Sequence, residues 1–317
     1  RNIHAPAPER ACAVRPAAVA ADRQSVSVVT SDRIEWRGFD AGHPIRARIR
    51  ARMRRLNLPA RSRSIISMTV RLVQLTDPHL FGGASQQLRG VVTLQSLQRT
   101  LAAAASVIGA ADRVLLTGDL VQDDPDGYQH FAPLLGDLGK PIWCIPGNHD
   151  DVPAMRRALS QPPFVIGGHA DLGAWRVIML DSTLPNEARG RLSAAVLTEL
   201  ETALSMAPQR PALVCLHHHP IPMASEWLDD VGLENAADLW SVLDRHANVR
   251  AVLWGHVHQV HDSVRNGVRL LGTPSTCSQF LPNSAEFAID TLPPGYRTVA
   301  LLPSGELETE VHFVASQ

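Results

Sequence analysis

From residue 69 onward, short apolar runs alternate with longer stretches that carry apolar residues at helical spacing. The runs have five or six residues and are rich in Val, Ile and Leu, as strands buried on both faces usually are. They are VRLVQL (70–75), RVLLT (113–117), PIWCI (141–145), WRVIML (175–180), ALVCL (212–216) and RAVLW (250–254). The helical stretches lie at 91–108, 127–138, 193–206 and 234–246. This alternation predicts an α/β fold.

Asp, Asn or His follows within three residues of the end of each of these runs; the run at 175–180 is followed by Asp181 alone, and the other five by motifs of several residues. The segments are Thr76-Asp77-Pro78-His79, Gly118-Asp119, Gly147-Asn148-His149-Asp150, His217-His218-His219-Pro220 and Gly255-His256-Val257-His258. In open α/β sheets, ligands bind beyond the carboxyl ends of the strands. We therefore expect these polar side chains to converge at one edge of the fold.

This set of carboxylates, imidazoles and one carboxamide contains no cysteine and suits Zn, Mn or Fe better than Ca, which prefers oxygen alone. Seven candidate ligands are too many for one ion that keeps an open position, but they suffice for two ions that share a carboxylate. Two ions about 3.5–4 Å apart could hold a phosphate and lower the pKa of a water between them. His149, beside Asn148, could then protonate a leaving alkoxide.

The motifs Asp-x-His, Gly-Asp, Gly-Asn-His-Asp, His-x-Pro and Gly-His-x-His occur in this order between Asp77 and His258. Together they resemble the calcineurin-like metallophosphoesterase family. The resemblance implies that family's α/β fold, in which two packed mixed β-sheets are flanked by helices. Residues 216–239 and 273–297 also resemble the bacterial class III 3′,5′-cyclic-AMP phosphodiesterases.

The resemblance also implies a role for each candidate residue. The first metal would be bound by Asp77, His79 and His258, the second by Asn148, His218 and His256, and Asp119 would bridge them. His149 would be the catalytic imidazole, and Asn148 and His149 would bind the substrate. His218 fits the His-x-Pro motif because Pro220 follows it, so His217 and His219 are expected in supporting or packing roles.

Three other polar positions near these motifs have less specific expectations. The family's phosphatases carry an Asp three residues after the bridging Asp, where this chain has Gln122, and either Asp123 or Asp124 could replace it. Asp150 is expected to cap a helix that begins near Pro153. Asp181 is expected to accept a supporting hydrogen bond or to form a turn.

The implied activity is hydrolysis of 3′,5′-cyclic AMP to 5′-AMP by attack of a hydroxide held between the metals. Other phosphate esters are alternatives, namely 2′,3′-cyclic nucleotides, glycerophosphodiesters, phosphomonoesters and DNA. A non-catalytic scaffold is a further alternative, but this chain keeps His149 and every metal position. Residues 69–317 carry a net charge of −10, which argues against a stable nucleic-acid partner because phosphate backbones bind to basic surfaces.

Residues 1–68 differ in composition from the rest. They contain 14 Arg, no Lys and 5 acidic residues, without a sustained apolar period, so this extension is predicted to be disordered, with the metallophosphoesterase domain at 69–317. An arm that contacts nucleic acid or lipid and a transit-type segment are alternatives. Arg54-Arg55 is followed by LNLPARSRS rather than by an apolar stretch, which disfavours export.

The remaining composition indicates an internal location. Cys12, Cys144, Cys215 and Cys277 are widely spaced, which is typical of reduced thiols, so a cytoplasmic location is expected. No apolar run approaches the length needed for a transmembrane segment. Relatives in the resembled family often form dimers, so a homodimer is a possible assembly.

Overall fold

The computed structural model describes residues 68–314. The predicted disorder of residues 1–68 therefore falls, Met68 apart, outside the described residues. The proposed domain boundary at that point stays a prediction.

Two six-stranded mixed sheets form the described structure. The first has the order β14-β13-β1-β4-β5-β6 and the second the order β11-β12-β10-β9-β8-β7. The strands of the first are β1 (Val70–Leu75), β4 (Arg113–Thr117), β5 (Ile142–Ile145), β6 (Phe164–Ile166), β13 (Gly295–Leu301) and β14 (Leu307–Phe313). Those of the second are β7 (Gly168–Leu172), β8 (Trp175–Met179), β9 (Ala212–Cys215), β10 (Val249–Trp254), β11 (His261–Arg265) and β12 (Val268–Gly272).

The central strands of each sheet are parallel, so their carboxyl ends lie at one edge. β1 pairs with β4, and β4 with β5, in parallel. In the second sheet, β9 pairs in parallel with β8 and with β10. Antiparallel partners complete the sheets at β13, β14, β7 and β11. A short hairpin of β2 (Gln87–Leu88) and β3 (Val91–Val92) stands apart from both sheets.

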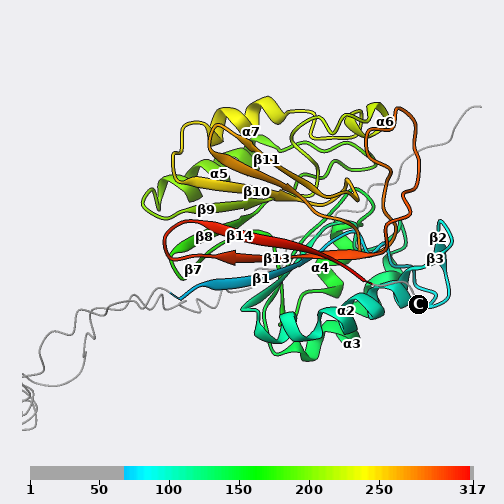
Figure 1. The fold of residues 1–317 in the computed structure, drawn as a ribbon. Coiled ribbons are helices and arrows are strands. Elements are labelled where there is room, and N and C mark those ends of the chain that lie inside the picture. The colour runs from blue at the N-terminus through cyan, green and yellow to red at the C-terminus, as the bar shows by residue number, and fades with distance from the viewer. Residues whose placement is uncertain (1–67, 315–317) are drawn as a thin grey trace, which may run out of the picture. The chain divides into compact units, whose positions relative to one another are not determined.

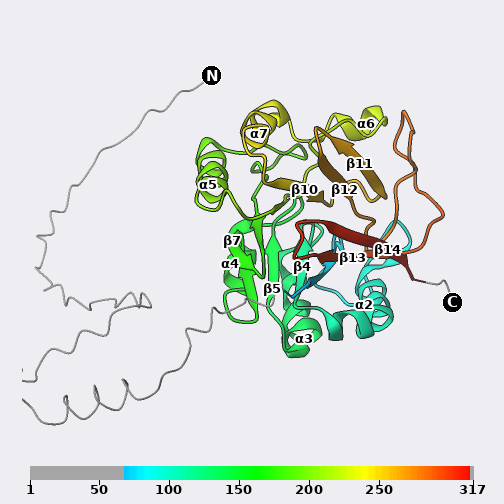
Figure 2. The ribbon, with the colours of Figure 1, turned by 60° about the vertical axis from the view of Figure 1, so that its left-hand side comes forward.

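Helices cover the outer face of each sheet, so the fold has four layers (Figures 1 and 2). The first sheet is covered by α2 (Thr93–Ala110), η1 (Pro125–His130), α3 (Phe131–Leu135), η2 (Gly136–Leu138) and α4 (Val152–Ala158). The second is accompanied by α5 (Ala194–Ser205), α6 (Glu226–Asp229) and α7 (Ala236–Leu243).

Residues along β1 alternate between two hydrophobic clusters, one on each face of the first sheet. Val70 and Leu72 pack into the cluster between the two sheets, together with Trp175. Val73 and Leu75 point the other way, into the cluster beneath the helices. Successive strand residues face opposite sides, so a strand covered on both faces needs apolar residues on both. The sequence prediction of two packed mixed sheets flanked by helices is confirmed.

One predicted helical stretch is divided in the structure. The stretch expected at 127–138 is helical, but it consists of three short pieces, η1, α3 and η2. Pro133 has no N–H to donate and is tolerated only in the first turn of an α-helix, which agrees with a new start at Phe131. Gly136 at the end of α3 further weakens a continuous helix.

Candidate metal centre

Loops at the carboxyl ends of β1, β4, β5, β9 and β10 meet and bring the predicted polar residues together. Five of the seven candidate ligands there have a left-handed backbone, which is uncommon outside glycine. The φ angles are 53° at Asp77, 49° at His79, 50° at Asp119, 65° at His256 and 46° at His258. Such conformations cost about 1–3 kcal/mol each and persist only where the surroundings hold them. Their concentration at one edge is typical of a functional site.

Hydrogen bonds between the loops hold this backbone. The N–H of His79 donates to the carbonyl of Asp119 at 3.0 Å. The N–H of His149 donates to Oδ1 of Asp119 at 3.0 Å, and the N–H of His256 donates to Oδ1 of Asp77 at 3.0 Å. Backbone donors thus orient both carboxylates, and Oδ2 of Asp119 is left to face the imidazoles.

Two glycines allow this close approach. Gly118, with a φ of 97°, packs so closely on the His217 ring that a Cβ there would overlap it. A Cβ on Gly147 would overlap the carboxylate of Asp119. Both positions therefore require glycine, because the neighbouring side chains pack too closely to leave room for a Cβ.

Asp77, His79, His258 and Asp119 form a first group of possible ligands. Nε2 of His79 lies 3.0 Å from Nε2 of His258 and 3.7 Å from Oδ2 of Asp119. Nε2 of His258 lies 3.5 Å from Oδ1 of Asp77.

Asp119, Asn148, His217 and His256 form a second group. Nε2 of His217 lies 3.4 Å from Oδ2 of Asp119. The same nitrogen lies 3.2 Å from Oδ1 of Asn148 and 3.2 Å from Nδ1 of His256. One oxygen of Asp119 therefore borders both groups.

The spacing of these donor atoms fits metal ions. Ligand atoms about 2.0–2.2 Å from one ion lie roughly 3–3.5 Å apart at tetrahedral or octahedral angles. The donor distances in both groups, 3.0–3.7 Å, are close to this value. In addition, Nδ1 of His79 and Nε2 of His256 are buried without a hydrogen-bond partner among residues 68–314. The residues present thus fit the metal chemistry predicted from the sequence.

Burial keeps most of these imidazoles neutral, which is the state that binds metals. It lowers the pKa of His79 to about 3 and the pKa values of His218 and His256 well below their usual range. Burial also lowers the pKa of His217, but the carboxylate of Asp119 outweighs it and raises that pKa to about 9. A metal ion in the second group would therefore displace a proton from His217.

Backbone carbonyls orient two of the imidazoles. Nδ1 of His258 donates to the carbonyl of Ser278 at 2.7 Å, and Nδ1 of His217 donates to the carbonyl of Thr117 at 2.8 Å. Such bonds select the tautomer whose Nε2 carries the free lone pair. Both Nε2 atoms then point into the site, and the lone pair on Nε2 of His217 is free once its extra proton has left.

The three consecutive histidines have different surroundings. His217, expected in a supporting role, directly contacts the predicted ligands Asp119, Asn148 and His256. His218 lies with Nδ1 2.8 Å from Oγ of Ser182, and its buried Nε2 has no hydrogen-bond partner within the described part of the chain. A donor atom of His218 still lies within 4.8 Å of donors on His217 and His256. The sequence could have indicated that His217 lies beside these ligands, because it is the first residue of the triplet and lies closest to the end of β9.

His219 has a packing role, as expected. Its ring stacks on His256 at 5.6 Å between centroids. Burial lowers the pKa of His219 to about 3, and its Nε2 lies 3.8 Å from the Asp229 carboxylate.

The predicted catalytic imidazole lies at the rim of the first group. The ring of His149 is 5.3 Å from that of His79, edge to face. Nδ1 of His149 lies 2.9 Å from Oδ2 of Asp123 and 2.9 Å from Nε2 of Gln122. Of the two acidic candidates, Asp123 is thus the one beside His149. Asp124 instead accepts from the N–H groups of Gly82 and Asp126.

The expectation that Asp150 caps a helix is wrong. Asp151 is the N-cap of α4 and accepts from the N–H of Ala154. The Asp150 carboxylate turns inward and accepts from the N–H groups of Gly147, Leu120 and Val121 and from the hydroxyl of Tyr128. The cap therefore lies one residue later, and Asp150 joins the loops after β4 and β5. Asp181 accepts from the N–H and hydroxyl of Thr183, which is the expected turn.

Comparison with known proteins agrees with this description. The family model for calcineurin-like phosphoesterases matches residues 70–260. A protein named 3′,5′-cyclic adenosine monophosphate phosphodiesterase CpdA in Haemophilus influenzae is 42% identical over 244 residues, which cover 76% of this chain and 89% of that protein. The protein of the same name in Pseudomonas aeruginosa is 39% identical over 262 residues, which cover 82% and 94%.

Solved structures share the fold. A dimetal phosphatase from Danio rerio superposes with a TM-score of 0.55 at 14% sequence identity, covering 78% of this chain and 99% of that one. The purple acid phosphatase PPD1 from yellow lupin seeds has a TM-score of 0.55 at 13% identity, covering 79% and 52%. The chain belongs to the calcineurin-like phosphoesterase family, which confirms the resemblance seen in its motifs.

Among the helices of residues 68–314, none has the length and apolar character needed to cross a bilayer.

Proposed function

We propose that this chain is a 3′,5′-cyclic AMP phosphodiesterase that works with two metal ions. Its relatives of 39–42% identity carry that substrate in their names. The observation that carries the two-metal part is the position of Asp119, whose Oδ2 borders two separate groups of donor atoms.

The proposed ligands follow the sequence assignment except at the second ion, where His217 takes the place of His218. Asp77, His79 and His258 hold the first ion, Asn148 and His256 contribute to the second, and Asp119 is shared. We add His217 to the second ion because it contacts three of the predicted ligands. His218, with its nitrogen bonded to Ser182, then supports the second group from the side.

Nitrogen and oxygen donors without thiolate suit Fe, Mn or Zn. Two such ions, when bound, supply positive charge to the phosphodiester and lower the pKa of a water between them. The protein's own contribution begins with Asn148 and His149, which line the substrate side of the site.

His149 is proposed to deliver the proton that the leaving 3′-oxygen needs. With Nδ1 directed at Asp123, Nε2 is free for the substrate, and the carboxylate holds the ring in this orientation. Asp123 acts through His149, so it is a positioning residue. Hydrolysis of the P–O3′ bond then yields 5′-AMP, with the proton from His149 on O3′ and water supplying the new oxygen on phosphorus.

A cytoplasmic location and a homodimer are also proposals. The location is supported by three free, buried cysteines among the described residues, namely Cys144, Cys215 and Cys277. Burial raises the pKa of the Cys277 thiol to about 11, as expected of an unreactive thiol. Cell fractionation tests the location, and light scattering of purified protein tests the dimer.

The decisive experiment is an activity screen of purified protein stripped of metal and reconstituted with Fe, Mn or Zn. The substrates are 3′,5′-cyclic AMP, 2′,3′-cyclic AMP, glycerophosphocholine and p-nitrophenyl phosphate. We expect the highest kcat/KM for 3′,5′-cyclic AMP and little activity in the stripped protein. A clear preference for 2′,3′-cyclic AMP or glycerophosphocholine would assign another diester, and metal-loaded protein inactive on every substrate would favour a scaffold.

A further inference from the structure

The tip of the β2–β3 hairpin presents an arginine in an unusual backbone conformation. Arg89 and Gly90 form the two-residue turn, with φ angles of 52° and 81°. Two-residue hairpin turns with two positive φ angles favour Asn-Gly or Gly-Gly, so arginine at the first position is disfavoured. The backbone of Arg89 is therefore strained at the tip of the hairpin. Such strain points to a role for the side chain that is held there.

Arg89 lies against aromatic rings. Its Cζ is 5.2 Å from the ring centroid of Phe280 and 4.9 Å from that of Phe287. Trp227 packs edge to face on both phenylalanines, with 5.1 Å between centroids in each pair. These cation–π and aromatic contacts fix the guanidinium without neutralising it.

The aromatic cluster touches the metal centre directly. The Phe280 ring is stacked on the ring of His258, with 4.0 Å between centroids and an interplanar angle of 5°. Arg89 and Phe287 therefore lie one aromatic ring away from a proposed metal ligand.

Both groups are open to solvent. The Arg89 side chain is exposed and has no hydrogen bond or ion pair with any residue of 68–314. Phe287 is 47% exposed, whereas Phe280 behind it is only 7% exposed. An exposed aromatic face beside an uncompensated planar cation is chemically suited to a flat, electron-rich ring.

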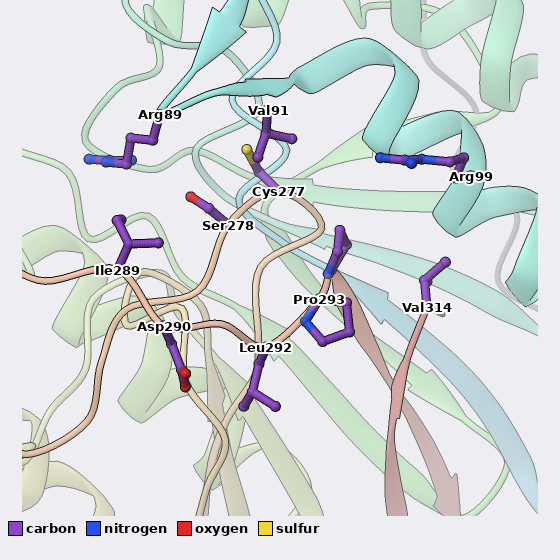
Figure 3. A pocket seen from close by; sticks show the side chains of 11 residues that line it. Arg89, Val91, Arg99, Cys277, Ser278, Ile289, Asp290, Leu292, Pro293 and Val314 are labelled. Carbon is purple, nitrogen blue, oxygen red and sulfur yellow. The ribbon is translucent and has the colours of Figure 1, made fainter. Parts of the chain in front are cut away.

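The neighbouring cavity does not contain the metal centre. It has a volume of about 270 Å³ and is lined by Arg89, Arg99, Cys277 and Ser278, among others. None of the predicted metal ligands lines it, although the Ser278 carbonyl accepts from His258. Figure 3 shows Arg89 and Arg99 on opposite sides, with the guanidinium of Arg89 directed away from Arg99. Arg89 therefore lines this cavity with its guanidinium on the side away from Arg99.

We propose that Arg89 and Phe287 form a subsite for the base of the nucleotide whose phosphate occupies the metal centre. The base stacks on Phe287, and the guanidinium of Arg89 contacts its face or its acceptor atoms. This inference rests on the proposed function. A phosphate role for Arg89 is disfavoured because the Phe280 ring packs against both Arg89 and His258.

The first test compares substrates with and without a base in metal-loaded protein. Phe287→Ala and Arg89→Ala should each raise the KM for 3′,5′-cyclic AMP about 10- to 100-fold, the usual range for loss of one stacked base, with kcat little changed. Hydrolysis of methyl p-nitrophenyl phosphate, which has no base, should stay within about twofold. Phe287→Tyr should retain the wild-type KM because it keeps the stacking surface.

Arg99→Ala is the matched control, since Arg99 is also an exposed arginine that borders the cavity and is also without an ion pair among the described residues. Arg99→Ala should leave the kinetic constants for both substrates unchanged. The subsite would be overturned if Phe287→Ala lost equal activity on both substrates. It would also be overturned if Arg99→Ala had as large an effect as Arg89→Ala. A changed oligomeric state in Phe287→Ala with unaltered KM would instead assign the ring to an interface.

A binding measurement separates this inference from the proposed activity. The metal-loaded wild type should bind 5′-AMP at least about tenfold more tightly than ribose 5-phosphate, and Phe287→Ala should abolish that difference. Calorimetry reads this difference whether or not 3′,5′-cyclic AMP is hydrolysed. If cyclic AMP is not a substrate but the difference persists, the proposed activity fails and the base subsite stands. Equal affinities in the wild type would reject the subsite.

Discussion

The rims of the two sheets supply different chemistry to the same centre. The loops after β1, β4 and β5 supply every oxygen donor, from Asp77, Asp119 and Asn148. The loops after β9 and β10 supply only imidazoles. Carboxylates bring the negative charge that retains a divalent cation, whereas neutral imidazoles add affinity for borderline metals without adding charge. The first rim offers only one imidazole among the proposed ligands, His79, and the second rim offers no oxygen donor, so the full set depends on how the two sheets pack.

The rims also hold each other in place. The backbone N–H of His256, from the second rim, donates to Asp77 of the first. Nδ1 of His217 donates to the Thr117 carbonyl at the end of β4. The side chain of Gln74 in β1 donates to the carbonyl of Trp254 in β10 at 3.2 Å. A substitution that removes one of these hydrogen bonds on one rim should therefore also displace side chains on the other.

Asp119→Ala should have the largest effect, since its carboxylate borders both donor groups. We expect both metals to be lost, with a fall in kcat/KM of at least ~10³-fold, because several kcal/mol of charge stabilisation disappear. Elemental analysis and steady-state kinetics check this outcome. A variant that retained two metals per chain would mean that the two donor groups do not share this residue.

His149→Ala should separate chemistry from metal binding on the first rim. Metal content should stay at the wild-type level while kcat falls ~10²–10⁴-fold, the usual worth of a general acid. Asp123→Asn should produce a smaller loss and an altered pH–rate profile, because it acts only through His149. Loss of metal in His149→Ala would show that this imidazole is a ligand.

The second rim is tested by a pair of adjacent variants. His217→Ala should lose one metal and more than about 100-fold of activity, whereas His218→Ala should lose about 10- to 100-fold, as supporting residues do. Metal content is measured for both variants. The reverse order would restore His218 as the ligand and assign His217 to support.

Asp171→Asn probes the amino-terminal side of the second sheet and should have the smallest effect. The carboxylate accepts from Nε of Arg176 at 2.8 Å, which, with burial opposing, lowers the pKa of Asp171 below 3.8. The contribution of this ion pair to the free energy of unfolding is therefore present above pH 3.8. It is lost as the pH falls through the lower pKa that Asp171 has in the folded state. Urea unfolding should show a loss of less than about 1 kcal/mol at pH 7.

At a pH below the folded pKa of Asp171, wild type and Asp171→Asn should unfold alike. Activity per folded molecule should not change at any pH. A change in kcat would mean that the two ends of the second sheet are coupled.

Much of the fold could be predicted because its signals are local. The apolar runs at 70–75 and 113–117 are strands with those same bounds, since a strand covered on both faces needs apolar residues on both. Strands β11, β13 and β14 were not predicted. Partly buried and exposed residues alternate in β11 and β14, without one fully buried residue in either, and β13 pairs on one side with β1, which lies far away in the chain.

The sequence by itself determined which residue types end each central strand, and therefore that a metal-binding phosphoesterase chemistry was available. Tertiary structure decided which histidine of the triplet faces Asp119, which carboxylate meets His149, and that Asp150 turns inward while Asp151 caps α4. It also brought Arg89 to Phe287. These choices depend on contacts between loops far apart in the chain, and one residue of shift along a loop turns a side chain in another direction. Local sequence patterns carry no information about such a shift, because the packing of the two sheets sets it.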